Sequence, residues 1–289
     1  MSEFTDERPA PGADHDLASP ASLIREQGAV PLAPPLPGAL ARVGKAAATA
    51  VRKFIRDATR TLDRETVARL YLRGAGLEIG ALHEPLKVPT GVRVRYVDRL
   101  STPDLRRQYP ELATLDLVEV AVVDDGERLA TIADDSEDFV VANQVLEHCQ
   151  NPLATIEQWL RVLKPNGILF LSLPDKRFSF DVDRPVTSVE HVLRDYREGP
   201  AWSRRQHFEE WVTFVEKVAP DRRAARVDEL MRVDYSIHFH VWTQTAMLAL
   251  IEAAQGLFGG LEVELFLKTS YDVEHLIVLR KLPSATAPA

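Results

Sequence analysis

The chain has 289 residues, of which 45% are hydrophobic and 27% charged, and its formal net charge is -8 at pH 7. These values are typical of a globular protein with one large domain or two small ones, and they exclude collagen-like, coiled-coil and wholly disordered chains. The negative charge argues against nucleic acid as the main partner, because such binding depends on cations that meet phosphates. The single cysteine, Cys149, cannot form a disulfide within the chain, so nothing requires an oxidising compartment.

The N-terminal part divides into two segments before the main domain. Residues 1–40 hold seven of the 19 prolines and several acids, a composition that predicts a disordered tail. The start lacks the basic and then apolar run of a secretory signal, and no stretch is long and apolar enough to span a membrane, so we expect a cytoplasmic protein. Apolar residues at helical spacing predict an N-terminal helical cap over 41–74, with a basic polar face.

From residue 75 onward, short β-branched segments alternate with helical ones. The predicted strands cover 76–80, 92–98, 117–124, 138–144 and 167–174, and the predicted helices cover 103–112, 152–163 and 243–254. This alternation predicts a parallel sheet with right-handed crossovers. Segments 261–270 and 273–282 are joined too closely for a crossover and should form an antiparallel hairpin. The fold class is therefore α/β, a Rossmann-like, seven-stranded, mostly parallel sheet over residues 75–283, with a lid insertion at 175–242.

Polar residues and glycines stand where the predicted strands end. Gly80 follows the first strand and Asp98 ends the second, while Asp124, Asp125 and Gly126 follow the third and Asn143 and Gln144 the fourth. The carboxyl ends of parallel strands form the usual ligand crevice, where an acid after the second strand can accept both hydrogen bonds of a ribose diol. A dinucleotide would need a glycine-rich turn at a helix N-terminus, and the segment after Gly80 has two prolines instead. The pattern favours an adenosine without phosphates.

In order and spacing, these segments resemble the class I S-adenosylmethionine-dependent methyltransferases, in particular the bacterial small-molecule group with a VLEH segment. The similarity covers about residues 75–175 and rests on Glu78-Ile79-Gly80, Asp98, Asp124-Asp125, the run from Asn143 to His148, and the turn from Arg161 to Gly167. The glycine motif departs from the family, because Leu82 and Glu84 stand where its later glycines fall. The resemblance implies S-adenosylmethionine as cofactor, and the residues assigned to it are Glu78, Gly80, Ala81, Asp98, Arg99, Asp124, Asp125, Gly126, Asn143, Gln144 and His148.

The long segment before the predicted helix 243–254 contains the candidates for acceptor chemistry. Methyl transfer to oxygen usually needs a base, for which histidine has a suitable pKa. The catalytic candidates are His191, His207, His238, His240 and Asp175. His238 and His240 would point to one face if they lay on a strand, either toward the acceptor or, with Glu147 and His148, toward a metal; the interpretation without a metal is preferred. Candidates for holding an anionic acceptor are Lys176, Arg177, Arg184, Arg204 and Arg205, unless they form a solvated surface.

The sequence thus predicts a methyltransferase that acts on a hydroxyl, or alternatively an amine, of a small molecule such as a sugar, a glycan fragment or a natural product. Neither nucleic acid nor a membrane is expected as partner, and a homodimer is left open. Two alternatives remain. One is a non-catalytic binding or scaffold protein with the same fold, suggested by the reduced glycine motif. The other is a nucleotide-sugar dehydrogenase or epimerase.

Overall fold

The computed structural model describes residues 63–109, 114–269 and 274–283. The tail predicted for residues 1–40 lies outside the described residues, as does most of the helical cap predicted for 41–74. From that cap the structure describes α3 (Arg64–Tyr71), which begins after Asp63, whose side chain accepts a hydrogen bond from Thr66 N. None of the described helices is long and apolar enough to cross a lipid bilayer.

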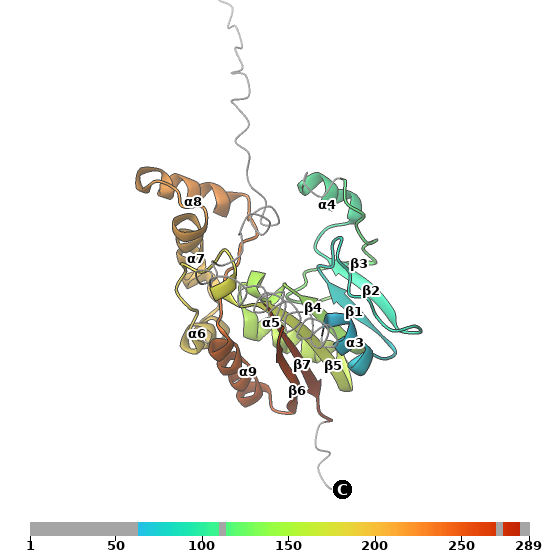
Figure 1. Ribbon diagram of the computed structural model, residues 1–289. Helices are drawn as coiled ribbons and strands as arrows, with labels where there is room; N and C mark the ends of the chain where they lie inside the picture. The colour runs from blue at the N-terminus through green and yellow to red at the C-terminus, as the bar shows by residue number, and fades with distance from the viewer. Residues whose placement is uncertain (1–62, 110–113, 270–273, 284–289) are drawn as a thin grey trace, which may run out of the picture. The chain divides into compact units, whose positions relative to one another are not determined.

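Seven strands of the described chain form one sheet in the order β3-β2-β1-β4-β5-β7-β6 (Figure 1). Their bounds are β1 Ala75–Ile79, β2 Arg93–Asp98, β3 Val122–Val123, β4 Glu137–Asn143, β5 Leu163–Pro174, β6 Leu261–Lys268 and β7 Glu274–Lys281. β1 to β5 pair in parallel, whereas β7 is antiparallel to both β5 and β6. The predicted fold class, a mostly parallel seven-stranded sheet with an antiparallel C-terminal hairpin, is confirmed.

Two strand lengths differ from the prediction. The third strand was expected over 117–124, but only Val122 and Val123 pair with β2. Ala121 N still donates to the Tyr96 carbonyl of β2, but further back Val118 N donates to the carbonyl of Leu82 in the loop after β1. The fifth strand was expected from residue 167 and begins at Leu163, which pairs with Glu137 ahead of an irregularity in the register.

The main helices begin at residues suited to capping. The bounds are α4 Thr102–Gln108, α5 Pro152–Val162, α6 Val189–Glu198, α7 Arg204–Glu210, α8 Arg223–Arg232 and α9 Gln244–Phe258. Asn151 caps α5 and is followed by proline in the first turn, while Thr243 caps α9. The predicted helix 103–112 is shorter than expected, because its last described helical residue is Gln108.

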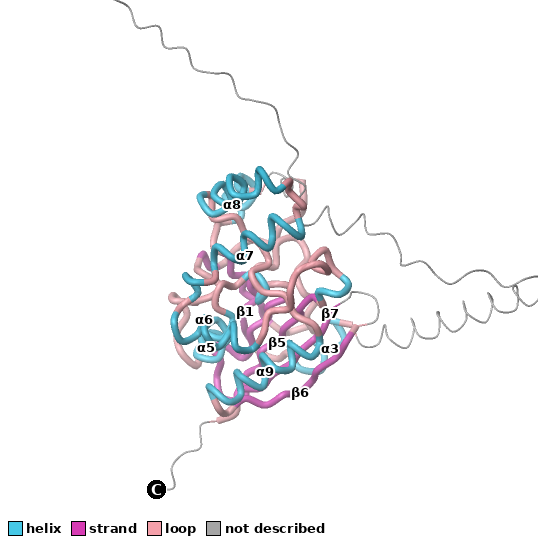
Figure 2. The backbone as a smooth tube through the Cα atoms, turned by 90° about the vertical axis from the view of Figure 1, so that its left-hand side faces the viewer, coloured by secondary structure: helices cyan, strands magenta, loops and turns pink. Residues whose placement is uncertain are grey.

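Each face of the sheet is covered by its own helices, and successive strand residues alternate between two apolar cores. Val140 and Ala142 pack in the core that includes α5 and α9, whereas Phe139 and Val141 pack in the core that includes α3. This period of two is the expected geometry of a strand buried on both faces. Figure 2 shows α9 running across the strands in the side view.

The insertion between β5 and α9 leaves and returns at one place, where Asp175 bridges to Trp242. Besides α6, α7 and α8 it contains the short elements η4 (Lys176–Phe178), η5 (Pro200–Trp202), η6 (Trp211–Val215) and η7 (Pro220–Arg222). Its aromatic residues form a separate small core, centred on Phe208, Trp211 and Phe239. In both views α7 and α8 lie together, beyond the sheet (Figures 1 and 2).

Gly76 stands where β1 is enclosed between β2 and β4, and an added methyl group has no room there. A Cβ at this position would lie 2.2 Å from the carbonyl oxygen of Phe139 and 2.6 Å from its ring. We expect Gly76→Ala to lower the free energy of unfolding by about 1–3 kcal/mol. Gly256→Ala is the matched control, because nothing lies within 4 Å of its Cβ and its helical position favours alanine by about 1 kcal/mol. Urea denaturation of both variants tests this, and equal effects would contradict the register of β1.

Candidate functional site

The parallel strands bring Gly80, Asp98 and Asn143 to one edge of the sheet. Ile79, the last residue of β1, is level with Val97 on one side and with Ala142 on the other. The next residue on each strand is therefore one of these three. Gly80 has φ +63°, a left-handed conformation that favours glycine, and its amide donates to the Val97 carbonyl at 2.9 Å. The expected crevice residues of β1, β2 and β4 are thus neighbours.

Glu78 organises the loop that replaces the glycine-rich turn. Its carboxylate is buried, and its two oxygens accept from Leu86 N at 2.9 and 3.1 Å. Asn143 Nδ2 donates to the same carboxylate at 3.4 Å. The loop after β1 is therefore fixed by a carboxylate at its base, which assigns Glu78 a role in shaping the loop and in holding Asn143.

Asn143 offers one polar atom that no described residue satisfies. Its Oδ1 is buried without a hydrogen-bond partner, at the end of β4 and beside Gly80. A buried amide oxygen without a donor is unfavourable, so such an atom calls for a donor from water or from a ligand. An ammonium group would supply it.

Asp98 ends β2 and is partly buried, and this burial raises the pKa of its carboxyl group above the usual value. Leu100 N donates to its Oδ1 at 3.3 Å, and no side chain of the described residues forms an ion pair with it. The carboxylate therefore keeps acceptor capacity at the sheet edge, as a ribose diol requires.

Two of the residues predicted to lie on the adenine side, Asp124 and Gly126, make hydrogen bonds that stabilise the turn after β3. The Asp124 carboxylate accepts from both Thr131 N and Thr131 Oγ1, at 2.7 and 2.6 Å. The Gly126 carbonyl accepts from Trp159 Nε1 at 2.8 Å, and a Cβ at Gly126 would lie 2.7 Å from Ile79. Asp125 also stabilises the turn, because its Oδ1 accepts from Glu127 N at 2.9 Å, but its side chain is exposed and lines a pocket of about 630 Å³ between this turn and α5.

Other residues predicted to bind the cofactor make different contacts. Gln144 has φ 55°, and its Nε2 donates to Ser172 Oγ and Glu274, on β5 and β7. Its amide is thus engaged with those strands, and its assignment to the cofactor stays a prediction. Arg99 donates to the hydroxyl of Tyr109 in the segment after α4. Ala81 follows Gly80 in the loop and is partly exposed.

The histidines separate into two clusters, which corrects the expectation that His238 and His240 share a face. Residues 236–241 are not in a strand, so the alternation assumed for them does not apply. His238 packs edge-on against His148, with ring centroids 4.6 Å apart. His240 instead lies among His191, Asp195 and His207. The two clusters have no residue in common, although each takes one histidine from the segment between α8 and α9.

The first cluster contains a carboxylate-histidine pair beside the end of β4. Asp181 Oδ2 lies 2.7 Å from His238 Nδ1, and both side chains are buried. Arg184, also buried, donates from NH1 to Asp181 Oδ1 at 3.1 Å and to the His238 carbonyl at 2.6 Å. The pair fixes the tautomer and orientation of the ring, and no described residue hydrogen-bonds to His238 Nε2. Sequence reasoning did not single out Asp181, since nothing in its neighbourhood marks one acid of the insertion above another.

His148 and Glu147 complete this cluster in η3 (Leu146–His148), the turn that follows β4. Burial, together with the nearby His238, lowers the pKa of His148 to about 3, so its ring is neutral. Its Nδ1 lies 3.1 Å from Ser236 Oγ. Burial raises the pKa of Glu147 to about 7, and neither of its oxygens has a hydrogen-bond partner. His148 thus packs against the catalytic candidate His238, and its contact with the cofactor stays a prediction.

Asp175 is poorly suited to the catalytic role predicted for it. It is fully buried and accepts from Arg177 Nε and NH2 at 2.9 and 2.6 Å, and hydrogen bonds with Arg177, opposed by burial, lower its pKa. The five basic residues proposed to hold an anion each have a polar partner within the protein. Their partners are the Val182 carbonyl for Lys176, Asp175 for Arg177, Asp181 and Glu210 for Arg184, Asp234 for Arg204, and Glu209 and Asp228 for Arg205.

Glu78 makes the folding stability depend on pH. Burial raises its pKa from the usual 4.5 to about 7, although the hydrogen bond from Leu86 N acts in the opposite direction. The folded state therefore holds this proton more tightly than the unfolded state, so the free energy of unfolding falls as pH rises from 4.5 to about 7. Glu78→Gln should remove this pH dependence. As pH rises through that range, the free energy of unfolding of the variant should come to exceed that of wild type by up to about 3 kcal/mol. Urea denaturation at pH 5 and pH 8 measures this difference in the free energy of unfolding, with Glu84→Gln, a change at an exposed residue, as control. Parallel pH profiles for Glu78→Gln and wild type would contradict the prediction.

Comparison with known proteins gives one family and a set of distant structural similarities. The family model described as a methyltransferase domain matches residues 73–255. No curated protein matches the chain. Among solved structures, a SAM-dependent methyltransferase from Aquifex aeolicus is 11% identical, with 72% of this chain and 82% of that chain covered and a TM-score of 0.38.

Two further solved structures have similar values. A SAM-dependent methyltransferase from Methanosarcina mazei is 17% identical, with 74% of this chain and 95% of that chain covered and a TM-score of 0.40. A possible histamine N-methyltransferase from Thermotoga maritima is 13% identical, with 79% of this chain and 97% of that chain covered and a TM-score of 0.38. The family match itself spans more than half of the chain and includes β1 to β5 with the crevice residues. The protein therefore belongs to the methyltransferase-domain family.

Proposed function

We propose that the protein transfers a methyl group from S-adenosylmethionine, the cofactor expected of its family, to a hydroxyl group of a small molecule. The observation that carries the choice of a hydroxyl is the Asp181–His238 pair beside the end of β4. An alcohol must lose its proton during transfer and gains from a positioned base. An amine needs less help, and it is the second candidate.

The residues at the sheet edge suit this donor. Asp98 would accept hydrogen bonds from the ribose diol, and the unsatisfied Asn143 Oδ1 would accept from the methionine ammonium. Gly80 permits close approach to the backbone, and Asp125 is the candidate for the adenine side. When bound, the donor supplies an electrophilic methyl group on a cationic sulfonium. Ionised carboxylates near the sheet edge favour such a cation.

In this proposal His238 Nε2 takes the hydroxyl proton. Asp181 holds the opposite ring nitrogen and stabilises the imidazolium that results, while Arg184 fixes Asp181. The arrangement follows the base-and-orienter logic of other catalytic pairs. A small acceptor such as a sugar or natural product agrees with the net charge of -8, which disfavours nucleic acid.

The decisive experiment has two stages. First, thermal unfolding is followed with S-adenosylmethionine, its demethylated product and NAD; a ligand at a hundred times its dissociation constant adds roughly 2.7 kcal/mol of stability. Stabilisation by NAD alone would favour the dehydrogenase alternative, and no stabilisation by any of them would favour a scaffold. Second, pooled sugars, phenols, hydroxy acids and amines are screened for formation of the demethylated donor product. Turnover confined to amines would overturn the assignment of a hydroxyl.

A further inference from the structure

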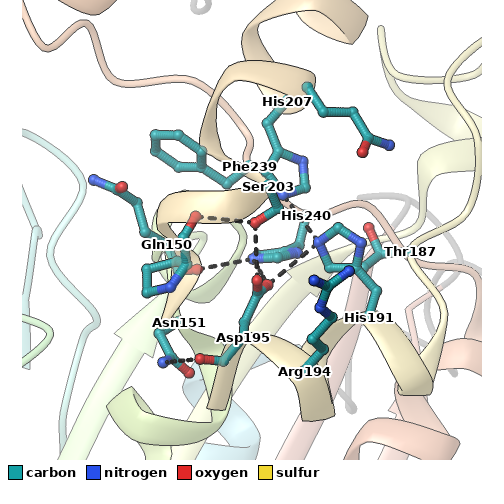
Figure 3. Close-up of polar contacts among 12 residues, drawn as sticks. Gln150, Asn151, Thr187, His191, Arg194, Asp195, Ser203, His207, Phe239 and His240 are labelled. Atoms are coloured by element: carbon teal, nitrogen blue, oxygen red, sulfur yellow. Dashed lines mark hydrogen bonds and ion pairs between the residues drawn. The ribbon is translucent and has the colours of Figure 1, made fainter. Parts of the chain in front are cut away.

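Four polar side chains of the insertion converge in a buried cluster away from the Asp181–His238 pair. His191 and Asp195 lie one helical turn apart on α6, His207 comes from α7, and His240 comes from the segment that follows α8. Asp195 and His240 have no exposed surface, and His207 is 4% exposed. Figure 3 shows the four side chains directed toward one another.

The donor atoms lie at distances typical of ligands around one ion. His191 Nε2 is 3.1 Å from His207 Nε2 and 3.3 Å from Asp195 Oδ2, and His240 Nε2 is 3.7 Å from the same oxygen. Zinc bound at 2.0–2.1 Å in a tetrahedral site requires ligand-to-ligand distances of about 3.3 Å. The observed separations bracket that value.

Hydrogen bonding within the protein satisfies this cluster only in part. Asp195 Oδ2 is buried with no hydrogen-bond partner, and two facing imidazole nitrogens can share only one proton. His240 Nε2 has the Gln150 carbonyl at 3.3 Å as its other polar neighbour. Asp195 Oδ1, in contrast, accepts from Ser203 Oγ at 2.8 Å, so the carboxylate is oriented with Oδ2 toward the histidines.

We propose that His191, Asp195, His207 and His240 bind one divalent transition-metal ion, with zinc the first choice. Three imidazoles and one carboxylate suit zinc and related first-row metals, whereas calcium and magnesium prefer sets made only of oxygen ligands.

Four protein ligands complete a tetrahedral zinc site, and a complete set is typical of a structural metal. The ion would join the neighbouring helices α6 and α7 to the segment at His240, which follows α8. His240 N also donates to the Glu147 carbonyl at 3.2 Å, so the metal would fix the insertion next to the turn after β4. This assignment does not depend on methyl transfer, and its test needs no acceptor.

The test is metal analysis of the full-length chain, purified without a chelator and with any affinity tag removed. We expect one equivalent of zinc per chain, lost with a strong chelator together with a lower melting temperature, and regained when zinc is returned. Cobalt substitution should give the intense visible absorption of a four-coordinate site. Asp195→Asn and His207→Gln should lose the zinc.

Two matched controls locate the ion. His238→Gln alters the other histidine cluster and should keep one equivalent of zinc, as should His275→Gln, a buried histidine on β7. If a ligand variant fails to fold, the loss and return of zinc in the wild-type chain still tests whether the protein binds the ion. No zinc in the wild-type chain and no uptake from added zinc, cobalt, manganese or iron would overturn the proposal. Retention in Asp195→Asn and His207→Gln with loss in His238→Gln would also overturn it.

Discussion

Asp98→Ala should weaken binding of S-adenosylmethionine by about 30- to 1,000-fold, which corresponds to roughly 2–4 kcal/mol for two hydrogen bonds to a charged group. Asp98 ends β2 level with Gly80, and its burial raises the cost of leaving a bound ribose without an acceptor. Isothermal titration with the donor and with its demethylated product measures the effect. Asp98→Asn should lie between wild type and alanine, because the amide keeps one acceptor oxygen.

Asp104→Ala is the matched control for this prediction. Asp104 follows Asp98 closely in the sequence, but it lies in the first turn of α4, and its side chain is 39% exposed. Its loss should leave the donor affinity unchanged. An unchanged affinity in Asp98→Ala as well would remove Asp98 from the cofactor site and with it the central contact of the proposed donor geometry.

His238→Gln should lower turnover by about 10²- to 10⁴-fold once an acceptor is known, while donor affinity stays near that of wild type. The ring nitrogen that would accept the proton is absent in this variant. Asp181→Asn should have an effect in the same direction, since it removes the charge that orients the ring and stabilises the imidazolium. The pH profile of kcat/KM then separates a base from a structural residue, because its acidic limb should be altered in both variants.

His275→Gln is the control, as it changes a buried histidine on β7 outside both clusters. Its turnover should match that of wild type wherever the variant is folded. Full turnover in His238→Gln with an intact acidic limb would show that this histidine is not the base. A loss of donor affinity equal to the loss of turnover would instead point to disturbance of the turn after β4.

The sheet could be predicted from the sequence because its signal is local. Phe139 to Ala142 are apolar without interruption, which marks a strand buried on both faces, and the capped helix from Pro152 to Val162 comes directly after that strand and its short turn. The crevice residues Gly80, Asp98 and Asn143 followed from the same logic, since parallel strands end at one edge. Strand alternation failed as a guide for His238 and His240, where no strand forms.

The sequence by itself therefore determined the make-up of the sheet, five parallel strands and a C-terminal hairpin, together with the edge where a ligand is expected and the family. Only the tertiary structure decided which polar groups meet. Asp181 and His238 are 57 residues apart, and their contact depends on how the insertion folds back. His191 and His240 meet for the same reason, with ring centroids 5.6 Å apart. Periodicity records which side of an element is buried, but the partner of a buried polar group is set by packing between elements distant in sequence.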